Sequence, residues 1–96
     1  MIREDYNKTY QAAAAANVVV TATPAYLHKI IIGADVGSGV IEISDSATDG
    51  DGNIFIKLAG NTLMTATGGE ITVNAKFGIG ITADLTNQTD VTFIWR

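Results

Sequence analysis

The strongest constraint on the fold is an apolar–polar alternation with a period of two that recurs along most of the chain. In GVIEISD (39–45), Ile41 and Ile43 fall on one side and Glu42 on the other. Successive side chains of a strand point to opposite faces, so this pattern predicts half-buried β-strands. The segments are separated by glycine and Asp/Asn clusters, which favour turns.

Seven segments fit this description, and the region 61–67 fits either a further strand or a loop that crosses between sheets. The seven are 17–23, 26–34, 39–45, 53–59, 70–75, 76–83 and 90–96. In 76–83 we expect Phe77, Ile79 and Ile81 to point inward. Short strands at intervals of about ten residues are typical of a β-sandwich or small barrel. The sequence predicts an all-β antiparallel sandwich, jelly-roll-like, with seven to eight short strands.

The sequence predicts two parts: an N-terminal arm at 1–16 and a sandwich domain at 17–96. The only helix-prone stretch, QAAAAAN (11–17), is too short to form a stable helix alone. Ile2, Tyr6 and Tyr10 recur every four residues, which suits a helical stripe, an extended arm anchored on a neighbour, or a frayed terminus. The candidate partner contacts are Ile2, Arg3, Tyr6, Tyr10 and Phe55.

Composition limits the function classes. The 96 residues make one domain, and without cysteine there is no disulfide or thiolate site. Ten acidic and six basic residues give a net charge of −4, which argues against nucleic acid and anionic membranes as partners. No apolar run reaches the roughly 18 residues of a membrane helix, and the polar, acid-containing N-terminus does not read as a secretory signal.

The stretch SDSATDGDGNIF (44–55) raises the possibility of a calcium loop, because Asp49, Asp51 and Asn53 match ligand positions 1, 3 and 5 of an EF-hand. The match then fails, since position 6 is Ile54 instead of glycine and position 12 is Gly60 instead of glutamate. We interpret the stretch as a long, outward-facing hairpin tip. A weak cation site at Asp49, Asp51 and Asn53 is the minority interpretation.

Other candidate sites favour structural roles. His28 is the only histidine and has no acidic neighbour in sequence, so we interpret it as a structural or surface residue. Ser38 does not sit in a nucleophile elbow, and no nucleophile–base pair is visible. We therefore predict no enzymatic activity, catalytic residue or cofactor. Phe55 lies opposite the apolar face formed by Ile54 and Ile56, so it is either an exposed partner contact or a cover for the second sheet face.

A proline turn precedes a Leu-His-x-Ile strand at 24–32, a strand ending in aspartate follows at 41–45, and a hairpin closes the chain at 80–95. This order of segments resembles that of small virion β-sandwich proteins of tailed bacteriophages. The resemblance covers most of 17–96 and contains no catalytic motif. It implies a structural role in the virion, and we expect a capsid decoration or cement protein that binds neighbouring subunits.

The resemblance also implies the partners, namely the major capsid protein or other virion proteins. We expect a homo-oligomer, with a trimer favoured, on the capsid surface after assembly in the host cytoplasm. The alternative is a tail- or fibre-associated module that recognises a glycan or a host surface.

Overall fold

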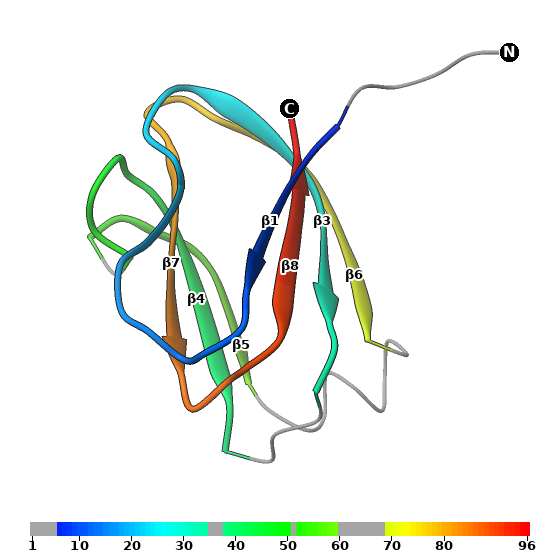
Figure 1. Ribbon diagram of the computed structural model, residues 1–96. Helices are drawn as coiled ribbons and strands as arrows, with labels where there is room; N and C mark the ends of the chain where they lie inside the picture. Colours follow the sequence, from blue (N-terminus) through cyan, green and yellow to red (C-terminus); the bar gives the residue numbers. More distant parts are fainter. Residues whose placement is uncertain (1–5, 35–37, 51, 60–68) are drawn as a thin grey trace, which may run out of the picture.

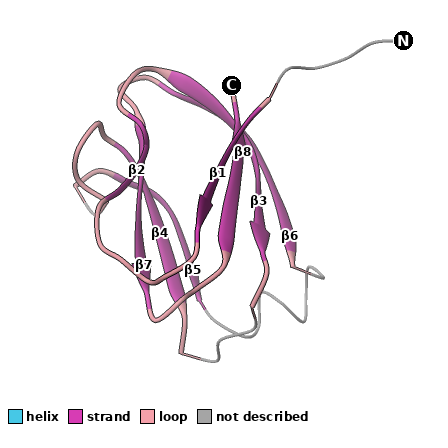
Figure 2. Cartoon of the chain, in the orientation of Figure 1, coloured by secondary structure: helices cyan, strands magenta, loops and turns pink. Residues whose placement is uncertain are grey.

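The computed structural model describes residues 6–34, 38–50, 52–59 and 69–96, which form eight β-strands. The strands are β1 (Asn7–Gln11), β2 (Val18–Thr21), β3 (Ala25–Ile32), β4 (Val40–Asp45), β5 (Ile54–Ala59), β6 (Glu70–Phe77), β7 (Ile81–Thr86) and β8 (Val91–Trp95). Figures 1 and 2 show two facing sheets. No helix in the described ranges is long and apolar enough to cross a membrane.

Each sheet contains four antiparallel strands, and the two strand orders are those of a jelly roll. We call the sheet ordered β1-β8-β3-β6 the first sheet and the sheet ordered β2-β7-β4-β5 the second sheet. Except for the β4–β5 hairpin, the chain changes sheet at every connection between consecutive strands. This interleaving is the double Greek key of the jelly roll, and it confirms the fold that the sequence predicts.

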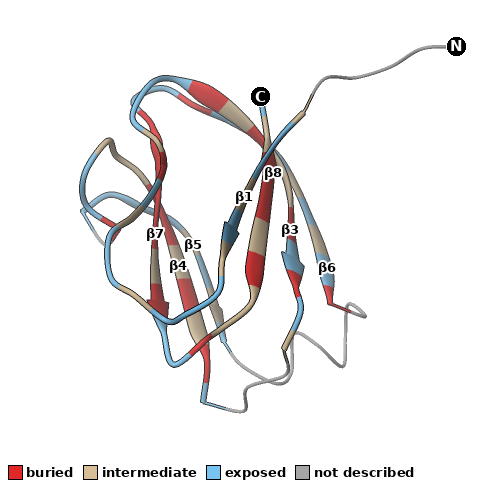
Figure 3. Ribbon diagram, viewed as in Figure 1, coloured by how far each residue is buried: buried red, intermediate tan, exposed pale blue. Residues whose placement is uncertain are grey.

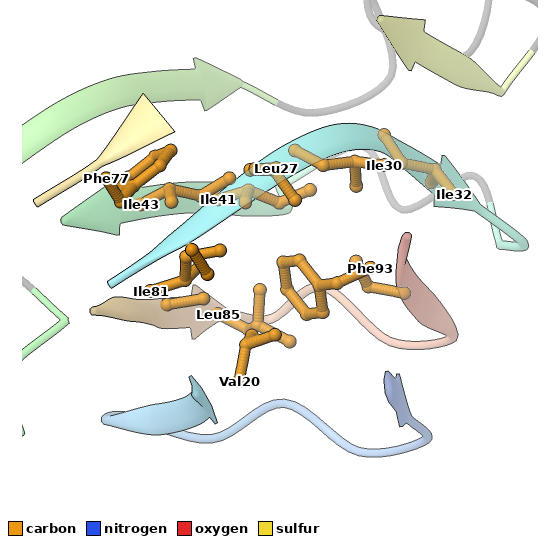
Figure 4. Close-up of a cluster of buried hydrophobic side chains, with 13 residues drawn as sticks. Val20, Leu27, Ile30, Ile32, Ile41, Ile43, Phe77, Ile81, Leu85 and Phe93 are labelled. Carbon is orange, nitrogen blue, oxygen red and sulfur yellow. The ribbon is translucent and has the colours of Figure 1, made fainter. Parts of the chain in front are cut away.

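The core lies between the sheets and is built from the inward residue of each alternating pair (Figures 3 and 4). Phe77 and Phe93 are its largest members, and both are fully buried. Branched aliphatic residues surround them: Leu27, Ile30, Ile32, Ile41, Ile43, Ile81, Leu85 and Val91. A single apolar cluster therefore holds the two sheets together, with each fully buried large side chain contributing about 1.5–3 kcal/mol.

Two sequence expectations need correction. Residues 7–11, placed in the arm, form β1 and pair with β8 from Asn7–Trp95 to Gln11–Val91. Their polar sequence concealed a strand because an edge strand buries little. The expected strand 76–83 is also wrong: β6 ends at Phe77, β7 begins at Ile81, and Ile79 between them is exposed.

Candidate interaction surfaces

The aspartate at the start of the acidic stretch fixes a turn instead of binding a ligand. Asp45, the last residue of β4, accepts backbone N–H bonds from Gly78 at 3.1 Å, Ile79 at 2.8 Å and Gly80 at 3.2 Å. These three residues make the β6–β7 turn. Gly80 approaches neighbouring backbone so closely that a Cβ there would lie 2.7 Å from the Thr21 carbonyl oxygen. Asp45 thus locks the position at which the chain crosses from the first sheet to the second.

The electrostatics of Asp45 follow from these bonds. Partial desolvation acts to raise the pKa of the Asp45 carboxyl, but the amide donors of Ile79, Gly80 and Gly78 outweigh it and hold the pKa below its usual value. The carboxylate is therefore the form that the fold stabilises. The sequence analysis interprets the stretch as a hairpin tip and assigns no such role to Asp45.

The β4–β5 loop packs on the second sheet at one point, Gly50. Gly50 is buried; its carbonyl accepts the Ser44 hydroxyl at 2.6 Å and its N–H donates to Asn17 Oδ1 at 2.9 Å. A Cβ on Gly50 would lie 2.7 Å from the carbonyl carbon of Ala83 in β7. Thr48, Asp49, Gly52 and Asn53 around it are exposed, so the loop is an outward-facing tip that is anchored at Gly50.

Two of the three cation-site candidates of this loop, Asp49 and Asn53, belong to the described residues, and Asp51 lies outside them. Asn53 uses its side-chain amide to donate to the Asp45 carbonyl at 3.5 Å. Among the described residues, no group of three or more His, Cys, Asp or Glu side chains could hold a metal ion.

Tyr6, a candidate for contact with a neighbour, packs on its own domain. Its ring stacks on His28 with centroids 4.7 Å apart, and the Arg96 guanidinium lies 5.1 Å from the Tyr6 ring centroid. Behind this stack, Asn74 Oδ1 accepts the Tyr26 hydroxyl at 2.8 Å and lies 2.6 Å from His28 Nδ1. The cluster fastens the segment before β1 to β3, β6 and the end of β8.

The other candidate contacts have different surroundings. Tyr10 remains 59% exposed, but its hydroxyl donates a short hydrogen bond to Asp90. That hydrogen bond, with desolvation and the negative charge of Asp90, raises the pKa of Tyr10. Phe55 is 52% exposed, while one part of its ring packs on Phe77 with centroids 4.9 Å apart. Ile2 and Arg3 lie outside the described residues.

The outer face of the first sheet collects most of the positive charge. Ile94 of β8 has Lys8 of β1 opposite it on one side and Lys29 of β3 opposite it on the other. Directly opposite residues share a face of the sheet, so both lysines lie on the same face as Ile94. Lys76 of β6 lies opposite Tyr26, whose backbone exchanges two hydrogen bonds with Arg96. Four of the chain's six basic residues therefore line this face, which we call the basic face.

Little negative charge accompanies these cations. The four strands of the first sheet contain a single acidic residue, Glu70, whose carboxylate pairs with Lys29 Nζ at 2.8 Å. Although Ile94 faces outward it is only 7% exposed, because the long side chains beside it cover it. The second sheet has the opposite character, since Glu42 lies opposite Asp84 on one side and Lys57 on the other.

Comparisons with known proteins add no assignment: no family model matches the chain, and neither the curated proteins nor the solved structures contain a match. The sequence analysis missed both the Asp45 turn contact and the basic face. The basic residues are spread from position 8 to position 96, and only strand order and register place them on one surface. The sequence shows which side of its strand each lysine occupies, but it does not show which strands are neighbours in the sheet.

Proposed function

We propose that this chain is a non-enzymatic virion structural protein that decorates a phage capsid by laying its basic face on an acidic surface of the shell. The observation that carries the proposal is the segregation of charge in an acidic domain. A chain of net charge −4 places Lys8, Lys29, Lys76 and Arg96 on the outer face of one sheet. Such a field orients the domain toward a negatively charged partner and repels other approaches.

The fold is compatible with this role but does not decide it. Jelly rolls occur in viral capsid proteins, lectins and cupins, so the function must be argued from the surface. The basic face is held on a rigid sheet, with β1 fastened by Tyr6 and by the hydrogen bond from Trp95 Nε1 to Thr9 Oγ1 at 3.0 Å. A preorganised surface binds without ordering costs, and repeated attachment over a shell makes modest single contacts sufficient.

The glycan-binding alternative has less support from the geometry. Sugar rings stack on exposed aromatic faces, whereas the Tyr6 ring is already engaged by His28 and by the Arg96 guanidinium. The same guanidinium lies 5.5 Å from the Tyr26 ring centroid. Tyr10 is the one described aromatic residue of the basic face with more than half of its surface exposed. A single ring is a poor platform for a glycan.

The direct test is mass spectrometry of purified phage particles produced by the host strain that carries the gene. The proposal expects the protein at high copy number, in proportion to the major capsid protein. Absence from intact particles would overturn it. A low copy number together with affinity in a glycan screen would instead support the tail or fibre module.

Charge-matched variants test the surface itself by co-sedimentation with particles that lack the protein. Lys8→Gln with Lys76→Gln removes two cations from the basic face, and attachment should weaken at least tenfold. Val19→Glu with Thr86→Glu makes the same change in net charge on the exposed outer side of the second sheet and should have little effect. Equal losses in both double variants would refute the assignment, as would tight binding of duplex DNA that competes with attachment.

Attachment should also weaken with salt, because exposed charges are screened beyond a Debye length of about 8–10 Å at physiological ionic strength. The salt dependence should be shallower for the lysine double variant than for the unmodified protein. Deletion of 1–5 tests the arm, since a deletion of all of 1–16 would also remove β1 from its sheet.

A further inference from the structure

The two sheets end in four edge strands, β1 and β6 in the first sheet and β2 and β5 in the second. An edge strand carries backbone groups on its free side that pair readily with another strand, so soluble proteins usually protect it with charge, bulges or short length. The edge with the least protection is therefore the best candidate for pairing with a strand of another molecule.

Three of the four edges are protected. β1 has the polar sequence NKTYQ, and β2 has only four residues with a register shift between Val19 and Thr21. β6 carries Glu70 and Lys76, and Asn74 interrupts it with a positive φ of 50°. Each device disfavours the addition of a further strand.

β5 is the least protected of the four edges, because Lys57 is its single charged residue. Its six residues, IFIKLA, include five apolar ones, and β4 is its one strand partner within the described ranges. A register shift near Ser44 affects the start of β5 only, where Ile54 is 47% exposed. Further along, Ile56 and Leu58 face the core but stay partly exposed, because the sheet stops beside them.

We propose that the β5 edge binds the β5 edge of a second copy, antiparallel about a two-fold axis through Lys57. Directly opposite residues share a face, so the regular part of β5 pairs Ile56 with Leu58 of the second copy and Leu58 with its Ile56. The strand is thus complementary to itself. Ile43 lies opposite Ile56 and Ile41 opposite Leu58, so the apolar rows of the two copies would join across the axis.

The charges on the outer side fit the same register. The two Lys57 side chains meet at the axis, and each is flanked by Glu42 and then Asp84 of its own copy. The row therefore contains two cations between four carboxylates, so the repulsion between the lysines is balanced by neighbouring negative charge. The basic face lies on the other sheet, so this dimer leaves it exposed and does not depend on the proposed virion role.

The first measurement is the solution mass across a wide range of protein concentration, by light scattering coupled to size exclusion. We expect twice the mass of one chain, with dissociation on dilution. A monomer at every concentration would overturn the proposal. The same holds for a trimer, the state favoured from the sequence, since a two-fold β5 pair closes with two copies.

Lys57→Glu tests the register, because it would place six carboxylates in one row and should shift the dimerisation constant at least tenfold toward monomer. Lys76→Glu is the matched control: an exposed lysine on a different edge strand undergoes the same change of charge. Circular dichroism should show both variants folded. A dimer that survives Lys57→Glu, or that is weakened equally by Lys76→Glu, argues for another interface.

Cross-linking gives an independent readout, since the natural sequence has no cysteine. Lys57→Cys places two thiols opposite each other at the axis, where Cβ atoms are about 4.5–5.5 Å apart and a small adjustment permits a disulfide. Mild oxidation should convert this variant to a covalent dimer, while Lys8→Cys on the β1 edge should not cross-link. Equal cross-linking of both variants would refute the β5 pairing.

Discussion

Removal of the Asp45 carboxylate should destabilise the domain more than removal of any comparable exposed charge. In Asp45→Ala, the N–H of the buried Gly80 loses its acceptor in a place where water cannot replace it, at a cost of about 1–3 kcal/mol. The N–H groups of Gly78 and Ile79 are exposed and can bind water, so each adds only about 0.5 kcal/mol. The expected total is about 2–4 kcal/mol.

For a domain of this size, that loss corresponds to a decrease in melting temperature of about 10–30 °C, measurable by calorimetry or circular dichroism. Asp84→Ala is the control, because it removes another partly exposed carboxylate that lies opposite Glu42, and it should change stability by less than about 0.5 kcal/mol. If the two variants have the same melting temperature, the turn does not depend on the Asp45 carboxylate.

The pH dependence of stability gives a second check on the same residue. The folded-state pKa of Asp45 lies below its unfolded value, so its contribution is fully present above the ordinary value of 3.8. It is then lost as the pH falls through the folded-state pKa. The stability difference between the unmodified protein and Asp45→Asn should therefore shrink below about pH 4. A constant difference across this range would contradict the assignment.

Three further changes test other parts of the domain. Gly50→Ala places a Cβ 2.7 Å from the backbone of Ala83 and should cost about 1–3 kcal/mol in chemical denaturation. Tyr6→Ala removes the ring stack at the start of β1; it should cost about 1–2 kcal/mol and speed amide hydrogen exchange in that strand without changing it elsewhere. The raised pKa of Tyr10 means that its bond to Asp90 stabilises the fold below about pH 10, so the advantage over Tyr10→Phe should vanish as the pH rises above that value.

The fold could be predicted from sequence because its core strands obey the alternation rule closely. The alternation of Ile41, Glu42 and Ile43 places two of these side chains in the core, as expected. The errors have definite causes. β1 was missed because a polar edge strand leaves no apolar signal, and the β6–β7 turn was missed because Phe77, Ile79 and Ile81 continue the alternation through it.

The surfaces were less predictable, since they depend on contacts between distant parts of the chain. Net charge argued against acidic partners, yet it averages over a molecule whose cations gather on one face. Lys8 and Lys29 become neighbours only because β8 inserts between their strands. In the same way, nothing local to Asp45 indicates that its carboxylate reaches amides more than thirty residues along the chain. Strand order and register determine which of these distant residues become neighbours, and neither can be inferred from a single sequence.

The pairing of β1 with β8 has a consequence for biosynthesis. The ribosome makes β1 long before β8, its strand partner among the described residues, because Asn7 pairs with Trp95. β8 also separates β1 from β3, so the first sheet cannot assemble until β8 has been synthesised. We therefore expect folding to be slow for a domain of this length, because a long loop must close to complete the sheet. Until then the nascent chain exposes its apolar strands, which makes this interval the period when chaperones matter most.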